Sequence, residues 1–144
     1  MVKRTENSRE RRNRLCGMFL DYWLGESSQH EGNLLLAGAG LNGVVDTIRS
    51  SGRNTVWWSW FPESPAQHVS YPPDELFCEA IVRMPPEKER LKLCLEVVAA
   101  RLKPGASLWL FGANDEGIRS AEKLGAPFFD RGVTVSARKH ARGP

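Results

Sequence analysis

The chain has 144 residues, the size of one domain, and the composition of an ordinary globular protein. Hydrophobic residues make up 41% and charged residues 26%, and these values exclude a disordered, collagen-like or coiled-coil chain. No apolar run approaches the roughly 20 residues that cross a bilayer, and the amino-terminal end is charged where a secretory signal would be apolar. We therefore expect a cytoplasmic protein without a membrane partner.

Charge is unevenly distributed along the chain. Residues 1–14 carry six basic and two acidic side chains, residues 131–144 carry four basic and no acidic ones, and the body between them carries ten basic and fifteen acidic ones. Each end has a net charge of +4 and the body −5, within an overall +3. Basic ends are typical of nucleic-acid binding, although they also simply increase solubility. The side chains expected to contact phosphate are Lys3, Arg4, Arg9, Arg11, Arg12, Arg14, Arg138, Lys139 and Arg142.

The amino-terminal half is predicted to be a helix followed by a strand–helix–strand unit. Residues 9–24 form the helix, because one apolar stripe recurs at helical spacing; its members are Leu15, Met18, Phe19, Tyr22 and Trp23. We expect this stripe to pack on the domain, with a partner-binding or dimer-forming helix as the alternative. Residues 33–37 and 54–60 are predicted strands, and a glycine-rich turn and a short helix connect them.

The carboxy-terminal half continues the alternation of strands and helices. The predicted elements are a loop at 61–75, a strand at 76–83, a helix at 86–102, a strand at 106–111, a helix at 114–124 and a strand at 132–137. This rhythm indicates an α/β fold with a mostly parallel sheet of about five strands covered on both faces. We expect a small Rossmann-like three-layer sandwich in residues 26–144 and an added basic helix in residues 1–25.

The glycine-rich turn is a candidate nucleotide site. Gly38, Gly40 and Gly43 follow a strand and open a helix, where backbone N–H groups approach a phosphate or nucleoside closely. The pattern also calls for an acid at the end of the next strand, and the first carboxylate there is Glu63, already beyond Pro62. The alternatives are an S-adenosylmethionine site and glycines that only permit tight packing of strand and helix. With its acid missing, the turn is expected to hold no cofactor.

Three tryptophans and a phenylalanine lie at the end of the second predicted strand. Strand alternation places Trp58 and Trp60 on one face, with Val56, and Trp57 on the other. In a sheet covered on both faces these side chains are core by default. The alternative is that Trp60 and Phe61, at the carboxyl end of the strand, form a stacking platform for a base.

Cysteine and histidine give no sign of a metal centre. Cys16, Cys78 and Cys94 are scattered through apolar stretches, without zinc-ligand spacing or a disulfide framework. The three histidines lie far apart in loop or tail contexts. We expect no metal, and the spacing of the sequence points to no catalytic residue.

The turn after the third predicted strand resembles a known motif. Met84-Pro85-Pro86-Glu87 is similar to the Asn/Asp-Pro-Pro-aromatic turn of amino methyltransferases acting on bases, where the polar side chain and a carbonyl hold the target amine. Here Met84 replaces the polar residue and Glu87 the aromatic one. The turn is kept, while the groups that would hold an amine are absent.

A wider resemblance follows downstream. The stretches that carry it are residues 80–88, 102–105, 108–122 and 135–142. They look like the amino-terminal domain of the ribosomal RNA small-subunit guanine-N2 methyltransferases, most distinctively in Gly-Ala-Asn-Asp-Glu-Gly-Ile-Arg-Ser-Ala at residues 112–121. The resemblance covers residues 76–142 well and residues 33–61 loosely, and it implies a class I methyltransferase-like fold.

In that family two methyltransferase-like domains lie in tandem. The carboxy-terminal one binds S-adenosylmethionine and carries the Asn-Pro-Pro motif, whereas the amino-terminal one is a degenerate copy that supports folding and RNA substrate binding. The resemblance therefore implies a non-catalytic domain that assists binding of ribosomal RNA or of a catalytic methyltransferase partner. A compact S-adenosylmethionine-dependent methyltransferase using the turn at 38–43 is the alternative, and a purely structural or oligomerising domain is a third possibility.

The glycine loop at 112–120 admits two interpretations. A loop that enters a helix N-terminus can receive an RNA phosphate, with Arg119 one turn inside the helix. Alternatively, Gly112 and Gly117 are turn residues, Asn114 or Asp115 caps the helix, and Asp115 and Glu116 complement its dipole. The two acids favour the capping interpretation, and Arg119 remains a candidate RNA contact.

Overall fold

The computed structural model describes residues 8–27, 31–63, 67–112 and 133–136. In chain order the elements are α1 (Ser8–Ser27), β1 (Leu34–Ala37), α2 (Asn42–Ser50), β2 (Thr55–Trp58), β3 (Phe77–Arg83), α3 (Lys88–Ala99), β4 (Leu102–Gly112) and β5 (Val133–Ser136). The five strands form one sheet in the order β2-β1-β3-β4-β5, and all four pairings are parallel. The predicted α/β fold with a parallel sheet is confirmed.

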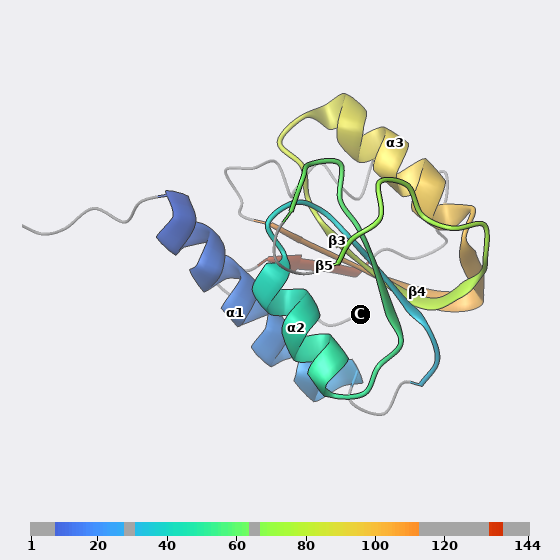
Figure 1. Ribbon diagram of the computed structural model, residues 1–144, viewed down its shortest axis with the longest axis horizontal. Coiled ribbons are helices and arrows are strands. Elements are labelled where there is room, and N and C mark those ends of the chain that lie inside the picture. Colours follow the sequence, from blue (N-terminus) through green and yellow to red (C-terminus); the bar gives the residue numbers. More distant parts are fainter. Residues whose placement is uncertain (1–7, 28–30, 64–66, 113–132, 137–144) are drawn as a thin grey trace, which may run out of the picture.

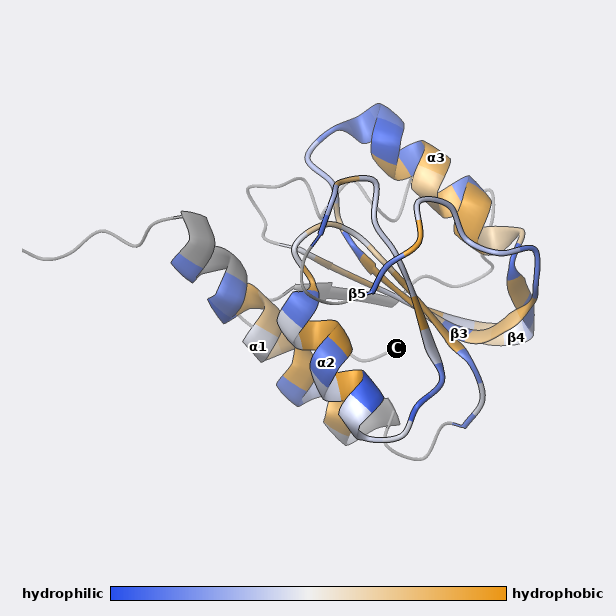
Figure 2. Cartoon of the chain, in the orientation of Figure 1, coloured by the Kyte–Doolittle hydropathy of each residue, from blue (hydrophilic) through white to orange (hydrophobic). Residues whose placement is uncertain are grey.

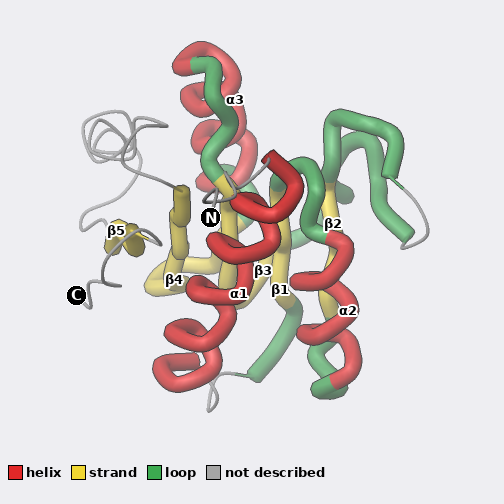
Figure 3. Tube along the Cα trace, turned by 90° about the vertical axis from the view of Figure 1, so that its left-hand side faces the viewer, coloured by secondary structure: helices red, strands yellow, loops and turns green. Residues whose placement is uncertain are grey.

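The sheet is the middle of three layers (Figure 1). Helices α1 and α2 lie on one face and α3 lies on the other, and the tube in Figure 3 shows α1 and α2 side by side across the strands. Most apolar residues in the described parts of the helices are buried against the sheet, and Figure 2 shows the hydropathy of each residue along these helices. The two faces of β2 separate as alternation requires, since Trp58 packs with α3 and Trp57 packs with α1 and α2.

Helix α1 is packed on the domain through the predicted apolar stripe. Phe19 is fully buried and its ring stacks on Phe111 of β4, with centroids 4.3 Å apart. Tyr22 approaches the ring of Trp109 edge-on at 6.0 Å. Because the stripe is covered within the chain, the packing interpretation of residues 9–24 is confirmed over the partner-binding one. The helix ends at Ser27, slightly beyond the predicted boundary at residue 25.

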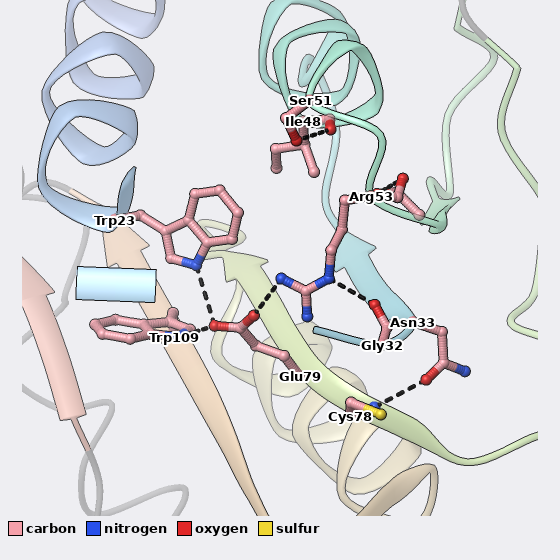
Figure 4. A network of polar contacts seen from close by, with 10 residues as sticks. Trp23, Gly32, Asn33, Ile48, Ser51, Arg53, Cys78, Glu79 and Trp109 are labelled. Carbon is pink, nitrogen blue, oxygen red and sulfur yellow. Dashed lines mark hydrogen bonds and ion pairs between the residues drawn. The ribbon is translucent and has the colours of Figure 1, made fainter. Parts of the chain in front are cut away.

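A buried polar network holds the end of α1 against the sheet (Figure 4). The Glu79 carboxylate on β3 accepts hydrogen bonds from the indole N–H groups of Trp23, at 3.1 Å, and Trp109, at 2.6 Å. Its other oxygen forms an ion pair with Arg53 at 2.9 Å, and the Arg53 Nε donates to the Gly32 carbonyl oxygen. The charge of Glu79 is thus buried together with its counter-ion, as an interior carboxylate requires.

Two strand boundaries differ from the prediction because of pairing that local sequence does not reveal. β2 stops at Trp58. The N–H of Ser59 donates to the carbonyl oxygen of Val69 and the N–H of Val69 donates to that of Trp57, so part of the predicted 61–75 loop returns along the outer edge of β2. β4 begins at Leu102 because that residue pairs with Phe77, while Glu79 pairs with Ser107. The extra residues form an irregularity that includes Gly105 at a φ of 81°. The predicted helix at 114–124 lies outside the described residues.

Candidate functional site

The glycine-rich turn lies at the carboxyl end of β1, beside β3. Gly38 has a φ of 139°, and a Cβ built on it would lie 2.8 Å from the Cβ of Arg83. Gly40 also has a positive φ, of 71°. Gly43 stands in the first turn of α2 with open space around it. The first glycine is therefore required by the close approach of the neighbouring strand β3, whereas the packing interpretation had expected close packing of strand and helix. Turn geometry favours the second glycine.

A carboxylate does reach this turn, which corrects the expectation that its acid is missing. The Oε2 atom of Glu63 accepts a hydrogen bond from the backbone N–H of Gly40 at 2.7 Å. The Ser59 hydroxyl donates to the same oxygen at 3.0 Å. Pro62 does not carry the acid away from the turn; the chain bends after β2 and brings Glu63 back. Sequence reasoning missed this contact because it joins residues on two separate loops.

Glu63 forms one wall of an open cleft of about 490 Å³. The residues that line it are Asn13, Ala39, Gly40, Asn42, Gly43, Phe61 and Glu63. The cleft thus joins the glycine turn, the loop after β2 and one residue of α1. The contribution of Asn13 was not predicted, because the sequence did not place α1 relative to the sheet. A cleft outside the carboxyl ends of parallel strands is where open α/β sheets bind ligands.

The end of β3 is apolar where the resembling turn is polar. Met84 is 3% exposed and packs in the core under α3, and its backbone N–H donates to the carbonyl oxygen of Phe111 at 2.9 Å. Glu87, in the place of the aromatic residue, is exposed and lies 3.6 Å from Arg90 in an ion pair. The thioether of Met84 offers only a weak acceptor to a substrate amine.

The aromatic residues after β2 divide into core and surface. Trp60 is partly buried against the α3 side of the core and meets Trp58 edge-on at 5.6 Å. Phe61 is 50% exposed. The guanidinium carbon of Arg90 lies 5.5 Å from the ring centroids of both Trp60 and Phe61. Of the predicted platform, Phe61 is the ring open to a ligand.

The predicted RNA contacts are only partly described. Arg14 is exposed on α1, with its Nη1 3.8 Å from the sulfur of Met18. Arg9, Arg11 and Arg12 lie on the first turns of the same helix, and the structure does not describe their side chains. Arg119, Arg138, Lys139 and Arg142 lie outside the described residues altogether. The structure therefore places one basic segment beside the cleft, since Asn13 lines that cleft.

The described part of the chain was searched for a metal site, a reactive thiol and a membrane-spanning helix. Among those residues there is no group of three metal-ligating side chains. Burial raises the pKa of the Cys94 thiol to about 12, so that thiol stays protonated near neutral pH and is a poor nucleophile. Within the described ranges no helix is long and apolar enough to cross a membrane.

Comparison with known proteins gives one family and one relative. The family model described as methyltransferase small domain N-terminal matches residues 27–141, which is more than half of the chain. A ribosomal RNA small subunit methyltransferase C from Pseudoalteromonas atlantica is 34% identical over 72 residues. That match covers 50% of this chain but only 21% of the relative, so the chain matches about a fifth of the length of this curated protein. No solved structure matches.

Proposed function

The chain belongs to the methyltransferase small domain N-terminal family, and we propose that it is a non-catalytic, methyltransferase-like domain that assists binding of an RNA substrate. The single observation that carries the proposal is the end of β3. There the buried side chain of Met84 stands where a base-directed amino methyltransferase would need a polar group. The side chain of Met84 has no polar group to orient the amine of a methyl acceptor, so we assign the chemistry to a catalytic methyltransferase domain or partner.

Binding of RNA is supported by the position of the basic helix. The amino-terminal turns of α1 carry Arg9, Arg11, Arg12 and Arg14, and Asn13 among them lines the cleft at the carboxyl edge of the sheet. Arginine contacts to phosphate release counterions, which supplies sequence-independent affinity. The relative from Pseudoalteromonas atlantica is named a ribosomal RNA methyltransferase, which favours ribosomal RNA as the class of substrate. Such a role fits the expected cytoplasmic location.

The test is the salt dependence of RNA affinity. We expect fluorescence anisotropy with a labelled RNA hairpin to show affinity falling steeply between roughly 50 and 200 mM salt. Replacing Arg12 and Arg14 together with Glu should lower the affinity on the order of tenfold and flatten the salt slope. A matched control replaces the exposed Lys92 and Lys103, which lie away from α1, with Glu. Equal loss in both variants, or affinity that ignores salt, would contradict the proposal.

A compact S-adenosylmethionine-dependent methyltransferase is the second candidate, and one observation favours it. Glu63 lies beside the glycine turn, where a carboxylate can accept hydrogen bonds from the hydroxyl groups of a ribose. Against it, the N–H of Gly40 is already engaged by that carboxylate. Titration calorimetry with S-adenosylmethionine and S-adenosylhomocysteine distinguishes this enzyme from the non-catalytic domain. Binding together with methyl incorporation into RNA would establish the enzyme, whereas no heat up to millimolar ligand would remove it.

A further inference from the structure

The carboxyl edge of the sheet combines an exposed aromatic ring, an oriented carboxylate and a cleft between them. We propose that Phe61 and Glu63 form a binding site for one unpaired ribonucleotide of the RNA substrate. The base would stack on Phe61, and hydroxyl or amino donors of the nucleotide would bind Glu63. The inference rests on the proposed RNA-binding function and deepens it, because it assigns the cleft to a single-stranded element of that RNA.

Phe61 has the support that a stacking platform needs. Its ring is half-exposed and borders the cleft. Arg90 lies at 5.5 Å from this ring and at the same distance from Trp60, which is packed against the core. The exposed ring thus contacts a cation that also contacts Trp60, a partly buried ring packed against the core. Because the ring already has this contact, stacking a base on it costs little side-chain entropy. Aromatic residues and arginine are the usual stacking partners of unpaired RNA bases.

Glu63 is fixed by one oxygen and open at the other. Gly40 and Ser59 donate to Oε2, and no donor among the described residues is assigned to Oε1. A carboxylate held in this way can accept a hydrogen bond from a hydroxyl or an amino group, and its negative charge repels phosphate. The ribose 2′-hydroxyl is one such donor, and it is the group that distinguishes RNA from DNA.

The cleft has the size and the surroundings for such a unit. Its volume of about 490 Å³ lies within the range that takes a small molecule. Because Glu63 repels phosphate, the phosphates on either side of the nucleotide must lie away from it. Arg14, which follows the cleft residue Asn13 on α1 and is exposed, supplies positive charge on that helix. We therefore expect the base and sugar to lie in the cleft and the phosphates to lie on α1. This arrangement keeps the phosphates away from the carboxylate of Glu63 and close to arginine.

The experiment uses an RNA hairpin with a single 2-aminopurine in its loop, because stacking of this base on a protein ring changes its fluorescence. We expect the change with the wild-type protein and with Phe61→Tyr, which keeps a ring. Phe61→Ala should lose the change and bind roughly tenfold more weakly. Tyr71→Ala is the matched control, since Tyr71 is 58% exposed and lies 5.2 Å from the guanidinium of Arg101, outside the cleft. Circular dichroism verifies that each variant is folded.

A second arm tests the carboxylate. Glu63→Gln presents an amide donor where Oε1 was an acceptor, so the preference for the RNA hairpin over its DNA counterpart should fall toward unity. Adenosine and S-adenosylhomocysteine serve as competitors in the same assay. Displacement of the stacked base by either one at micromolar concentration would assign the cleft to a free nucleoside and overturn the RNA assignment.

The outcomes separate this inference from the proposed function. If the α1 variant weakens RNA binding while Phe61→Ala changes neither affinity nor fluorescence, the ribonucleotide site is wrong and RNA binding by the domain stands. The ribonucleotide site is equally wrong if Tyr71→Ala has the effect of Phe61→Ala. If the wild-type protein binds no RNA, both ideas fail together.

Discussion

Two glutamates at opposite ends of the sheet have opposite surroundings. Glu79, at the amino end, is 1% exposed and has an arginine and two indole N–H groups as partners. Glu63, at the carboxyl end, is half-buried, with two donors on one oxygen and a cleft beside it. A buried charge needs all its partners inside the fold, whereas a charge at a rim keeps capacity for a ligand. The amino end therefore stabilises the fold, whereas the carboxyl end keeps a half-buried carboxylate beside a cleft, where we propose that a ligand binds.

Among the changes that test this difference between the two glutamates, Glu79→Ala is expected to lower the stability most. The change leaves the guanidinium of Arg53, which is 9% exposed, without its anion and deprives two indoles of their acceptor. We expect a loss of about 3–5 kcal/mol in the free energy of unfolding, measured by urea denaturation followed by tryptophan fluorescence.

Two further variants keep this prediction decisive. Glu79→Gln retains an acceptor oxygen and should lose less than Glu79→Ala. The matched change at the other end, Glu63→Ala, should cost about 1 kcal/mol or less, because water can reach its former partners. Equal losses at the two glutamates would break the comparison.

A medium effect is expected at the glycine turn. Gly38→Ala places a Cβ 2.8 Å from the Cβ of Arg83 at a φ of 139°, and the strain should lower the free energy of unfolding by about 1–3 kcal/mol. Gly43→Ala is the control, since a methyl group there meets open space in a helix. It should be neutral or stabilising by up to about 1 kcal/mol. Thermal melts of both variants report the difference, and a Gly38→Ala protein as stable as wild type would refute the packing role.

The smallest perturbation is thiol labelling, which needs no substitution and compares the reactivity of a buried cysteine with that of a half-buried one. Cys94 lies on the sheet-facing side of α3, and burial raises the pKa of its thiol to about 12, while Cys78 is only half-buried. A thiol reagent near pH 8 should modify Cys78 first and leave Cys94 intact until the protein unfolds, because the thiolate is the reactive form. Mass spectrometry of digested samples identifies the labelled residue. Equal labelling rates in the native protein would mean that the α3 face opens.

Patterns of near neighbours were sufficient to predict most of the architecture. The period of two in β2 assigned Trp57 and Trp58 to opposite faces, and the stripe of α1 identified Phe19 as a packing residue. Both patterns succeed because each element must bury one face, whatever lies against it. The candidate site was predicted in its glycines and in Phe61, whereas Asn13 and the contact of Glu63 with Gly40 were missed. These two come from α1 and from the loop after β2, which the sequence did not place beside the glycine turn.

The sequence by itself determined the class of fold, the apolar faces of its helices and strands, and the loss of a polar group at Met84. Tertiary structure alone decided that Glu63 meets Gly40, 23 residues away, and that Trp23 reaches Glu79, 56 residues away. Periodicity is a local property, fixed by the dihedral angles of successive residues. A contact between distant residues depends on the path of every loop between them, and that path is set only when the layers pack together.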